Sequence, residues 1–169
     1  MQKGILGTNI VTQIGFVVND VEKTAQAFAD FLGVDNPGWS LTDTIDKTQG
    51  EYNGKPCPAR AKLAFFHVGD TLDIELIEPD EQPSVWRDVL NEKGEGVHHI
   101  AFVIKGMKEK LIALDGDGHR IADGNNGQAA LDAGHGDIIE FLHGNPPLRQ
   151  NKAFAPFLFH YSILLPSWI

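Results

Sequence analysis

The stretch QIGFVV at residues 13–18 returns in a related form as HIAFVI at residues 99–104. Both are rich in β-branched and aromatic residues, which is typical of strands. A second pair follows in the same order, DIELIE at residues 73–78 and DIIEFL at residues 137–142, with the acid displaced by one residue so that Glu75 matches Glu140. A strand-helix-strand-strand-strand order can be traced through both halves, so the chain is predicted to contain two similar βαβββ modules.

The predicted boundaries follow from periodicity and turn residues. The first module covers residues 1–80, with strands at 12–18, near Trp39, at 61–68 and at 71–77. Asn19 or Asp20 is expected to cap its helix and Gly33 to end it. A loop is expected at 43–60 and a two-residue hairpin turn at Gly69-Asp70.

A connector at 81–95 is expected to hold a short helix around 84–90. The second module covers 96–145, with strands at 97–104, 127–132 and 137–142 and a helix at 107–114. An apolar tail at 146–169 is expected to pack against the domain or a partner subunit.

Composition narrows the class of protein. The 169 residues are 42% apolar, enough for one hydrophobic interior, and the net charge is −9 without any run of Lys or Arg. Nucleic acid and anionic membrane surfaces are therefore not expected as partners. A single cysteine, Cys57, excludes an internal disulfide, and no stretch resembles a signal peptide or a bilayer span. A cytoplasmic location is the resulting expectation.

Strand alternation predicts which side chains share a face. Gln13 and Gly15 point the same way, and so do His99 and Ala101. The small residues two positions after Gln13 and His99 leave room above the sheet. His98 is expected on the opposite face as a structural residue.

Glu75 and Glu140 are carboxylates in strands that are otherwise mostly apolar, so their side chains could be buried. Each is flanked on its strand face by isoleucine, leucine or aspartate, and Glu140 lies between Ile138 and Leu142. Burial of a carboxylate is costly unless a partner such as a divalent cation compensates the charge.

With these motifs, residues 12 to about 143 resemble the vicinal oxygen chelate superfamily, which includes glyoxalase I, methylmalonyl-CoA epimerase, extradiol dioxygenases and antibiotic-resistance proteins. The resemblance implies an α+β fold in which two βαβββ modules form a curved mixed sheet around a metal cleft. It also implies four metal ligands, Gln13, Glu75, His99 and Glu140, and a homodimer.

The resemblance points to two kinds of substrate. The Gln/Glu/His/Glu ligand set is similar to that of one form of glyoxalase I, which implies a thiol adduct of a 2-oxoaldehyde. The stretch PSVWRDVLNEKGEGVHHIAFVI at residues 83–104 is similar to methylmalonyl-CoA epimerase, which implies an acyl-CoA.

Three oxygen ligands and one imidazole suit one divalent ion such as Zn, Ni, Co, Mn or Fe. Two further coordination positions would remain for substrate oxygens, and the ion would act as a Lewis acid in a lyase or isomerase reaction that moves a proton next to a carbonyl. By analogy with the family, Glu140 is the expected base, with Glu75 as its symmetric partner.

Other interpretations stay open. Each glutamate alone could be a surface or salt-bridge residue, and His99 alone a hydrogen-bonded core histidine. The chain could be a metal-free protein that sequesters a ligand, as in bleomycin resistance. A ring-cleaving dioxygenase would more typically use two histidines and one carboxylate, which Gln13 disfavours. His67 has no evident partner.

Overall fold

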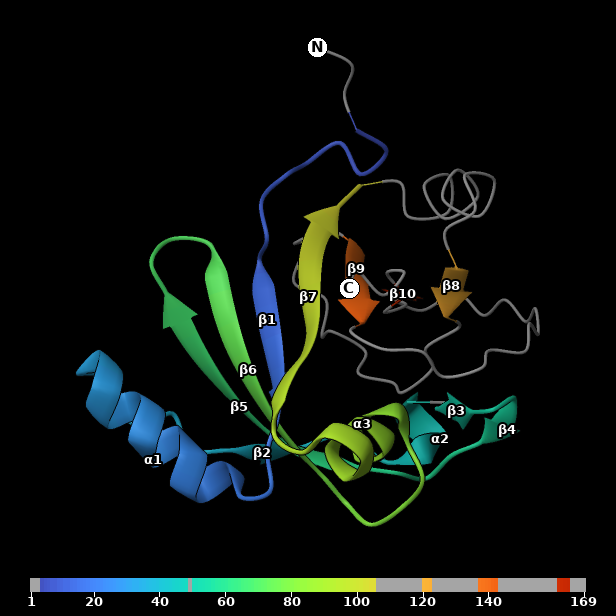
Figure 1. Cartoon of the computed structure of the whole chain (residues 1–169), viewed down its shortest axis with the longest axis horizontal. Helices are drawn as coiled ribbons and strands as arrows, with labels where there is room; N and C mark the ends of the chain where they lie inside the picture. Colours follow the sequence, from blue (N-terminus) through green and yellow to red (C-terminus); the bar gives the residue numbers. More distant parts are fainter. Residues whose placement is uncertain (1–3, 49, 106–119, 123–136, 143–160, 165–169) are drawn as a thin grey trace.

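The computed structural model describes residues 4–48, 50–105, 120–122, 137–142 and 161–164, and describes side chains for the first two of these ranges. Its main feature is a curved, mixed eight-stranded sheet in the order β2-β5-β6-β1-β7-β9-β10-β8 (Figure 1). The predicted α+β class with a curved mixed sheet is confirmed.

The first module has the predicted βαβββ order. It consists of β1 (Gln13–Val17), α1 (Val21–Leu32), β2 (Ser40–Leu41), β5 (Ala61–Val68) and β6 (Leu72–Pro79). The Asp20 side chain caps α1 by accepting a hydrogen bond from the backbone N–H of Lys23 at 2.9 Å. Gly33 ends the helix with a left-handed φ of 69°, a conformation that glycine adopts without steric cost.

Two local predictions need correction. The segment predicted as a loop contains α2 (Ile45–Thr48) and a small two-stranded sheet of β3 (Glu51–Tyr52) and β4 (Lys55–Pro56). The β5–β6 hairpin pairs Val68 with Leu72, so its connection has three residues, not the predicted two. This difference shifts every cross-strand pair of the hairpin by one residue.

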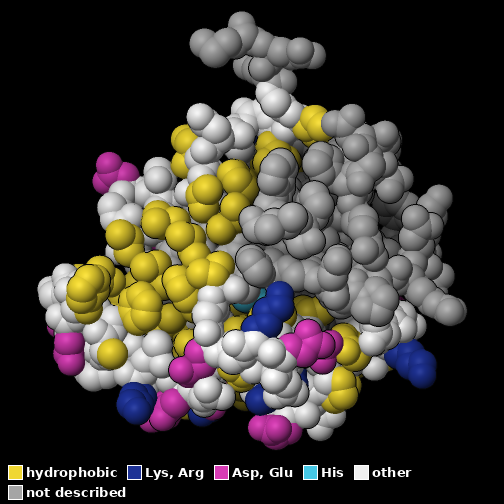
Figure 2. Space-filling model, viewed as in Figure 1, with side chains coloured by type: hydrophobic (Ala, Val, Ile, Leu, Met, Phe, Trp, Pro, Cys, Tyr) yellow, Lys and Arg dark blue, Asp and Glu magenta, His cyan; other side chains and the backbone are white. Residues whose placement is uncertain are grey.

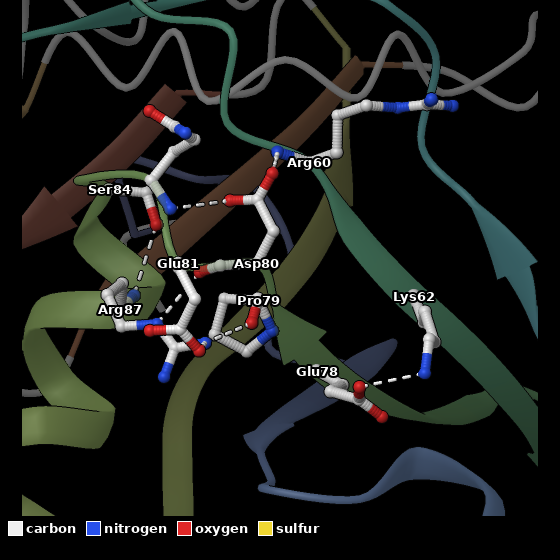
Figure 3. Close-up of polar contacts among 9 residues, drawn as sticks. Arg60, Lys62, Glu78, Pro79, Asp80, Glu81, Ser84 and Arg87 are labelled. Atoms are coloured by element: carbon white, nitrogen blue, oxygen red, sulfur yellow. Dashed lines mark hydrogen bonds and ion pairs between the residues drawn. The ribbon is translucent and has the colours of Figure 1, made fainter.

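The connector carries α3 (Val85–Lys93), which begins after the Ser84 cap and ends at Gly94. Figure 3 shows how polar contacts hold this helix to the end of β6. The Arg87 Nε donates to the carbonyl oxygen of Asp80 at 2.8 Å, and the Asp80 carboxylate accepts from the backbone N–H groups of Arg60 and Gln82 at 2.9 and 3.0 Å. These contacts fix the position of α3 relative to the first module.

The second half contributes β7 (Gly96–Ile104), β8 (Arg120–Ala122), β9 (Asp137–Leu142) and β10 (Tyr161–Leu164). The predicted strands at 97–104 and 137–142 are confirmed, whereas the predicted helix at 107–114 and strand at 127–132 lie outside the described residues. Part of the apolar tail forms β10, which pairs with β9 and β8 inside the sheet. β9 runs antiparallel to β7, although its counterpart β6 runs parallel to β1. Sequence similarity between two modules therefore did not specify strand direction.

The two faces of the sheet carry separate cores. On one face, α1 packs over a cluster that includes Val21, Ala29, Phe66 and Leu76. On the other face, Trp86 and Leu90 of α3 pack over a second cluster. In Figure 2, hydrophobic side chains gather on the surface over α1, β5, β6 and β1, and Phe31 of α1 is 86% exposed. None of the helices within the described ranges has the length and apolar character needed to cross a bilayer.

Candidate metal centre

The predicted site residues fall into two neighbouring cross-strand rows on β6, β1, β7 and β9. In the first row, Gln13 pairs with Asp73 and with Ala101, and Ala101 pairs with Glu140. In the second row, Gly15 pairs with both Glu75 and His99. Because directly paired residues share a sheet face, Gln13, Glu75 and His99 lie on one face of the sheet, which agrees with the predicted alternation of Gln13 with Gly15 and of His99 with Ala101. For Glu140 the structure describes the backbone position only.

Three of the four predicted ligands converge on one point. The His99 Nε2 atom lies 3.3 Å from Glu75 Oε2 and 3.4 Å from Gln13 Oε1. Glu75 and His99 are only 5% and 2% exposed. A buried carboxylate and imidazole beside an amide oxygen form a compact, oxygen-rich donor group that is shielded from water.

Gly15 makes room for the His99 ring. A Cβ atom at position 15 would lie 2.2 Å from Cε1 and 2.6 Å from both ring nitrogens of His99, which is far inside any allowed contact. Gly15 does not have a positive φ, so the backbone itself does not demand glycine. The glycine is required because the imidazole lies directly over it.

The surroundings of the donor group are apolar on one side and polar on the other. Phe65 is paired with Glu75, and Leu63 and Ile77 belong to the core cluster beneath α3. At the opposite end, His67 Nδ1 forms a very short contact with the Asp73 carboxylate. This pair extends the row that contains Gln13. The expectation that His67 has no partner is therefore wrong.

A sequence model of the Glyoxalase/Bleomycin resistance protein/Dioxygenase superfamily matches residues 12–136, about three quarters of the chain. The chain belongs to this superfamily. The predicted resemblance to the vicinal oxygen chelate proteins is thereby confirmed. The chain is also 36% identical over 106 residues to "Uncharacterized protein YqjC" of Bacillus subtilis (strain 168). That alignment covers 63% of this chain and 65% of the relative, so it spans less than two thirds of the relative's length.

Solved structures with the same fold include two methylmalonyl-CoA epimerases. The Mycobacterium tuberculosis epimerase superposes with a TM-score of 0.55 at 19% identity, covering 97% of this chain and 90% of that one. A variant of the Streptomyces coelicolor epimerase in complex with 2-nitronate-propionyl-CoA gives 0.51 at 18% identity, covering 93% and 97%. The hypothetical protein BH1468 of Bacillus halodurans C-125 gives 0.51 at 20% identity, covering 83% and 98%. At these identities the similarity establishes the fold.

The donor group of this superfamily member fits a divalent metal. Ligand atoms about 2.1 Å from an ion are about 3.0 Å apart when adjacent in an octahedron and about 3.4 Å apart in a tetrahedron. The observed separations of 3.3 and 3.4 Å from His99 Nε2 fall close to these values. The described ranges hold no group of three or more His, Cys, Asp and Glu side chains placed for a metal. The third described donor here, Gln13, is an amide. The imidazole nitrogen and the two oxygens have the donor chemistry that Zn, Ni, Co, Mn and Fe accept.

Tyr52 and Lys62, two titratable groups of the first module, have pKa values raised by their hydrogen-bonded partners. The hydrogen bond from Tyr52 Oη to Asp88 Oδ2, at 2.5 Å, raises the pKa of the Tyr52 hydroxyl, and burial adds to the increase. The hydrogen bond and ion pair with Glu78, at 2.8 Å, raise the pKa of Lys62. The other Glu78 oxygen accepts from the N–H of Val21 at 2.8 Å, so the Lys62–Glu78 pair (Figure 3) fixes the start of α1 on the sheet.

Sequence reasoning missed two features of the site. The first is the His67–Asp73 pair. It would have been predicted if the β5–β6 hairpin had been assigned a three-residue connection instead of a two-residue turn. The second is a contact between His98 and His99, whose Nδ1 atoms are 3.0 Å apart although alternation predicts opposite faces. The shift in strand register between Gly15 and Phe16 accounts for this contact, and the sequence around His98 does not indicate that shift.

Proposed function

We propose that this protein is a metal-dependent enzyme, an isomerase or lyase, that moves a proton on the carbon next to a carbonyl group. The observation that supports this most directly is the buried convergence of His99 Nε2 with the oxygens of Glu75 and Gln13. Gln13, Glu75, His99 and Glu140 would hold the ion. When bound, the ion would supply Lewis-acid stabilisation of negative charge on a substrate carbonyl oxygen.

The chain's own contribution is a pair of carboxylates. Glu75 lies on β6 and Glu140 on β9, with β1 and β7 between them. Three strand spacings of about 4.8 Å separate their Cα atoms by roughly 14 Å, so the two side chains would reach the ion from opposite sides, and either could leave the ion when the substrate arrives. One carboxylate can remove the proton and the other can return it from the opposite side, which inverts the carbon. We assign the first step to Glu140 and the return to Glu75.

An acyl-CoA is our first choice of substrate. The similarity of residues 83–104 to methylmalonyl-CoA epimerase supports it, and so do the epimerase structures that share the fold. A glyoxalase I-like reaction on a thiol adduct of a 2-oxoaldehyde is the second candidate, because the Gln/Glu/His/Glu ligand set favours it.

The test is exchange of the substrate proton in D₂O. The protein, loaded in turn with Zn, Ni, Co and Mn, is incubated with a 2-methyl-branched acyl-CoA or with the adduct of glutathione and methylglyoxal. Mass spectrometry follows deuterium uptake next to the carbonyl, and chromatography follows product. We expect Glu140→Gln to retain metal and to lose about 10²–10⁴-fold in rate. Full activity of Glu140→Gln would remove that residue from the mechanism, and exchange with neither substrate would reject both candidates.

Metal content separates this proposal from a metal-free ligand-sequestering protein. Elemental analysis should find close to one divalent ion per chain in the wild type and a loss of it in the Gln13→Ala/Glu140→Ala double variant. A wild-type protein that takes up none of the four metals would favour the sequestering function. A ring-cleaving dioxygenase would reveal itself by oxygen consumption with a catechol.

We also propose a homodimer and a cytoplasmic location. The exposed apolar surface around Phe31 supports an interface between subunits, and the single, buried, free Cys57 suits a reducing compartment. Light scattering of the purified protein tests the oligomeric state.

A further inference from the structure

The two adjacent histidines of β7 lie at an irregularity of the sheet. Gly15 pairs with His99, but the next residue, Phe16, pairs with Val97, so His98 is an extra residue on β7. Such a β-bulge breaks the strict alternation of side chains and can redirect one of them. The bulge lies in the strand that carries the predicted imidazole ligand.

As a result the two imidazole rings touch. Their centroids are 5.3 Å apart, their planes are nearly perpendicular at 88°, and their Nδ1 atoms are separated by 3.0 Å. Both residues are buried, with exposures of 1% and 2%. At this distance, one Nδ1 must carry a hydrogen and the other must accept it, because two bare nitrogens or two N–H groups would repel each other.

The two nitrogens of His99 therefore have different partners. Nε2 faces the oxygens of Glu75 and Gln13, whereas Nδ1 faces His98. An imidazole that binds a cation through Nε2 keeps its hydrogen on Nδ1, and ligand histidines usually donate that hydrogen to a fixed acceptor. Gly15 confines the same ring from below.

We propose that His98 is a positioning residue for the metal centre. Its Nδ1 accepts the hydrogen bond from His99 Nδ1–H, which holds the His99 ring in the orientation and tautomer that present the Nε2 lone pair to the ion. The hydrogen of neutral His98 then resides on its Nε2. This inference rests on the metal site of the proposed function.

The test compares His98→Asn with His98→Leu. Asparagine places a carbonyl oxygen near the position of the histidine Nδ1, whereas leucine has the same branched shape without an acceptor. We expect His98→Leu to weaken Zn²⁺ binding 10–100-fold in a chelator competition, and His98→Asn to stay within about threefold of the wild type. Urea unfolding of the metal-free variants serves as the control for folding, since both substitutions remove the same buried ring.

A second measurement needs no variant. A long-range ¹H–¹⁵N spectrum of the Zn-loaded wild type should show hydrogen on His99 Nδ1 and on His98 Nε2. Hydrogen on His98 Nδ1, or equal Zn²⁺ affinities of the asparagine and leucine variants, would overturn the positioning role and leave the proposed function intact. A wild-type protein that binds no divalent metal would overturn both.

Discussion

Replacing Gly15 by alanine should disable the site through a single methyl group. The added Cβ would lie 2.2 Å from His99 Cε1, whereas ordinary contact begins at 3.4 Å, so the ring must retreat by about 1.2 Å. That displacement is more than half of a metal–nitrogen bond of about 2.1 Å. It also displaces Nε2 relative to the oxygens of Glu75 and Gln13. We expect a loss of about 1–3 kcal/mol in the free energy of unfolding, typical of overpacking, and a loss of metal affinity of at least about 10²-fold.

The assay is a double-mutant cycle in urea, combined with calorimetric titration of Zn²⁺. In a His99→Ala background the ring is absent, so Gly15→Ala should cost less than about 0.5 kcal/mol. Gly4→Ala is the matched control, because a Cβ at position 4 meets no atom within 4 Å. An equal cost of Gly15→Ala with and without the His99 ring would refute the steric argument.

Three further predictions concern the scaffold and the ion. The raised pKa of Tyr52 means that its hydrogen bond contributes stability that is fully present below the unfolded pKa of about 10 and is lost as pH rises through the folded pKa. Tyr52→Phe should therefore lower the free energy of unfolding by about 1 kcal/mol near neutral pH. In urea titrations at alkaline pH, the difference between this variant and the wild type should shrink. Glu78→Ala removes the acceptor for the Val21 N–H and the partner of Lys62, so it should lower the free energy of unfolding by about 1–2 kcal/mol, and hydrogen exchange should rise first at the start of α1. Metal at about 100 times its dissociation constant should stabilise the fold by about 2.7 kcal/mol, seen as a rise of roughly 5–10 °C in Tm that EDTA reverses; an unchanged Tm would argue against the metal centre.

The common face of the site could be predicted from sequence because it depends on local rules. Successive side chains alternate along a strand, so the register of Gln13 with Gly15, and of His99 with Ala101, follows from the positions of the residues alone. The start and end of α1 could also be predicted from the sequence, since Asp20 and Gly33 act within one turn of the helix.

Features that depend on long-range pairing could not be predicted. The bulge at His98 exists only because β7 pairs with β1, and the His67–Asp73 contact depends on a hairpin register that differs by one residue from the simplest turn. The insertion of β10 between β9 and β8 requires a segment far along the chain to enter the sheet. Sequence periodicity carries no information about which distant strand becomes the neighbour.

The 86-residue separation of Gln13 and His99 has a consequence for biosynthesis. During translation, the first module with Gln13 and Glu75 emerges from the ribosome before β7 does, so the nascent chain first exposes these two oxygen donors without the imidazole of His99. The three-donor group can form only after a non-local strand pair closes, which is a late and comparatively slow event in folding. In the proposed metal centre, the full donor group would therefore be offered only by a nearly finished protein, and an ion captured early by the two oxygens would gain His99 as a ligand later.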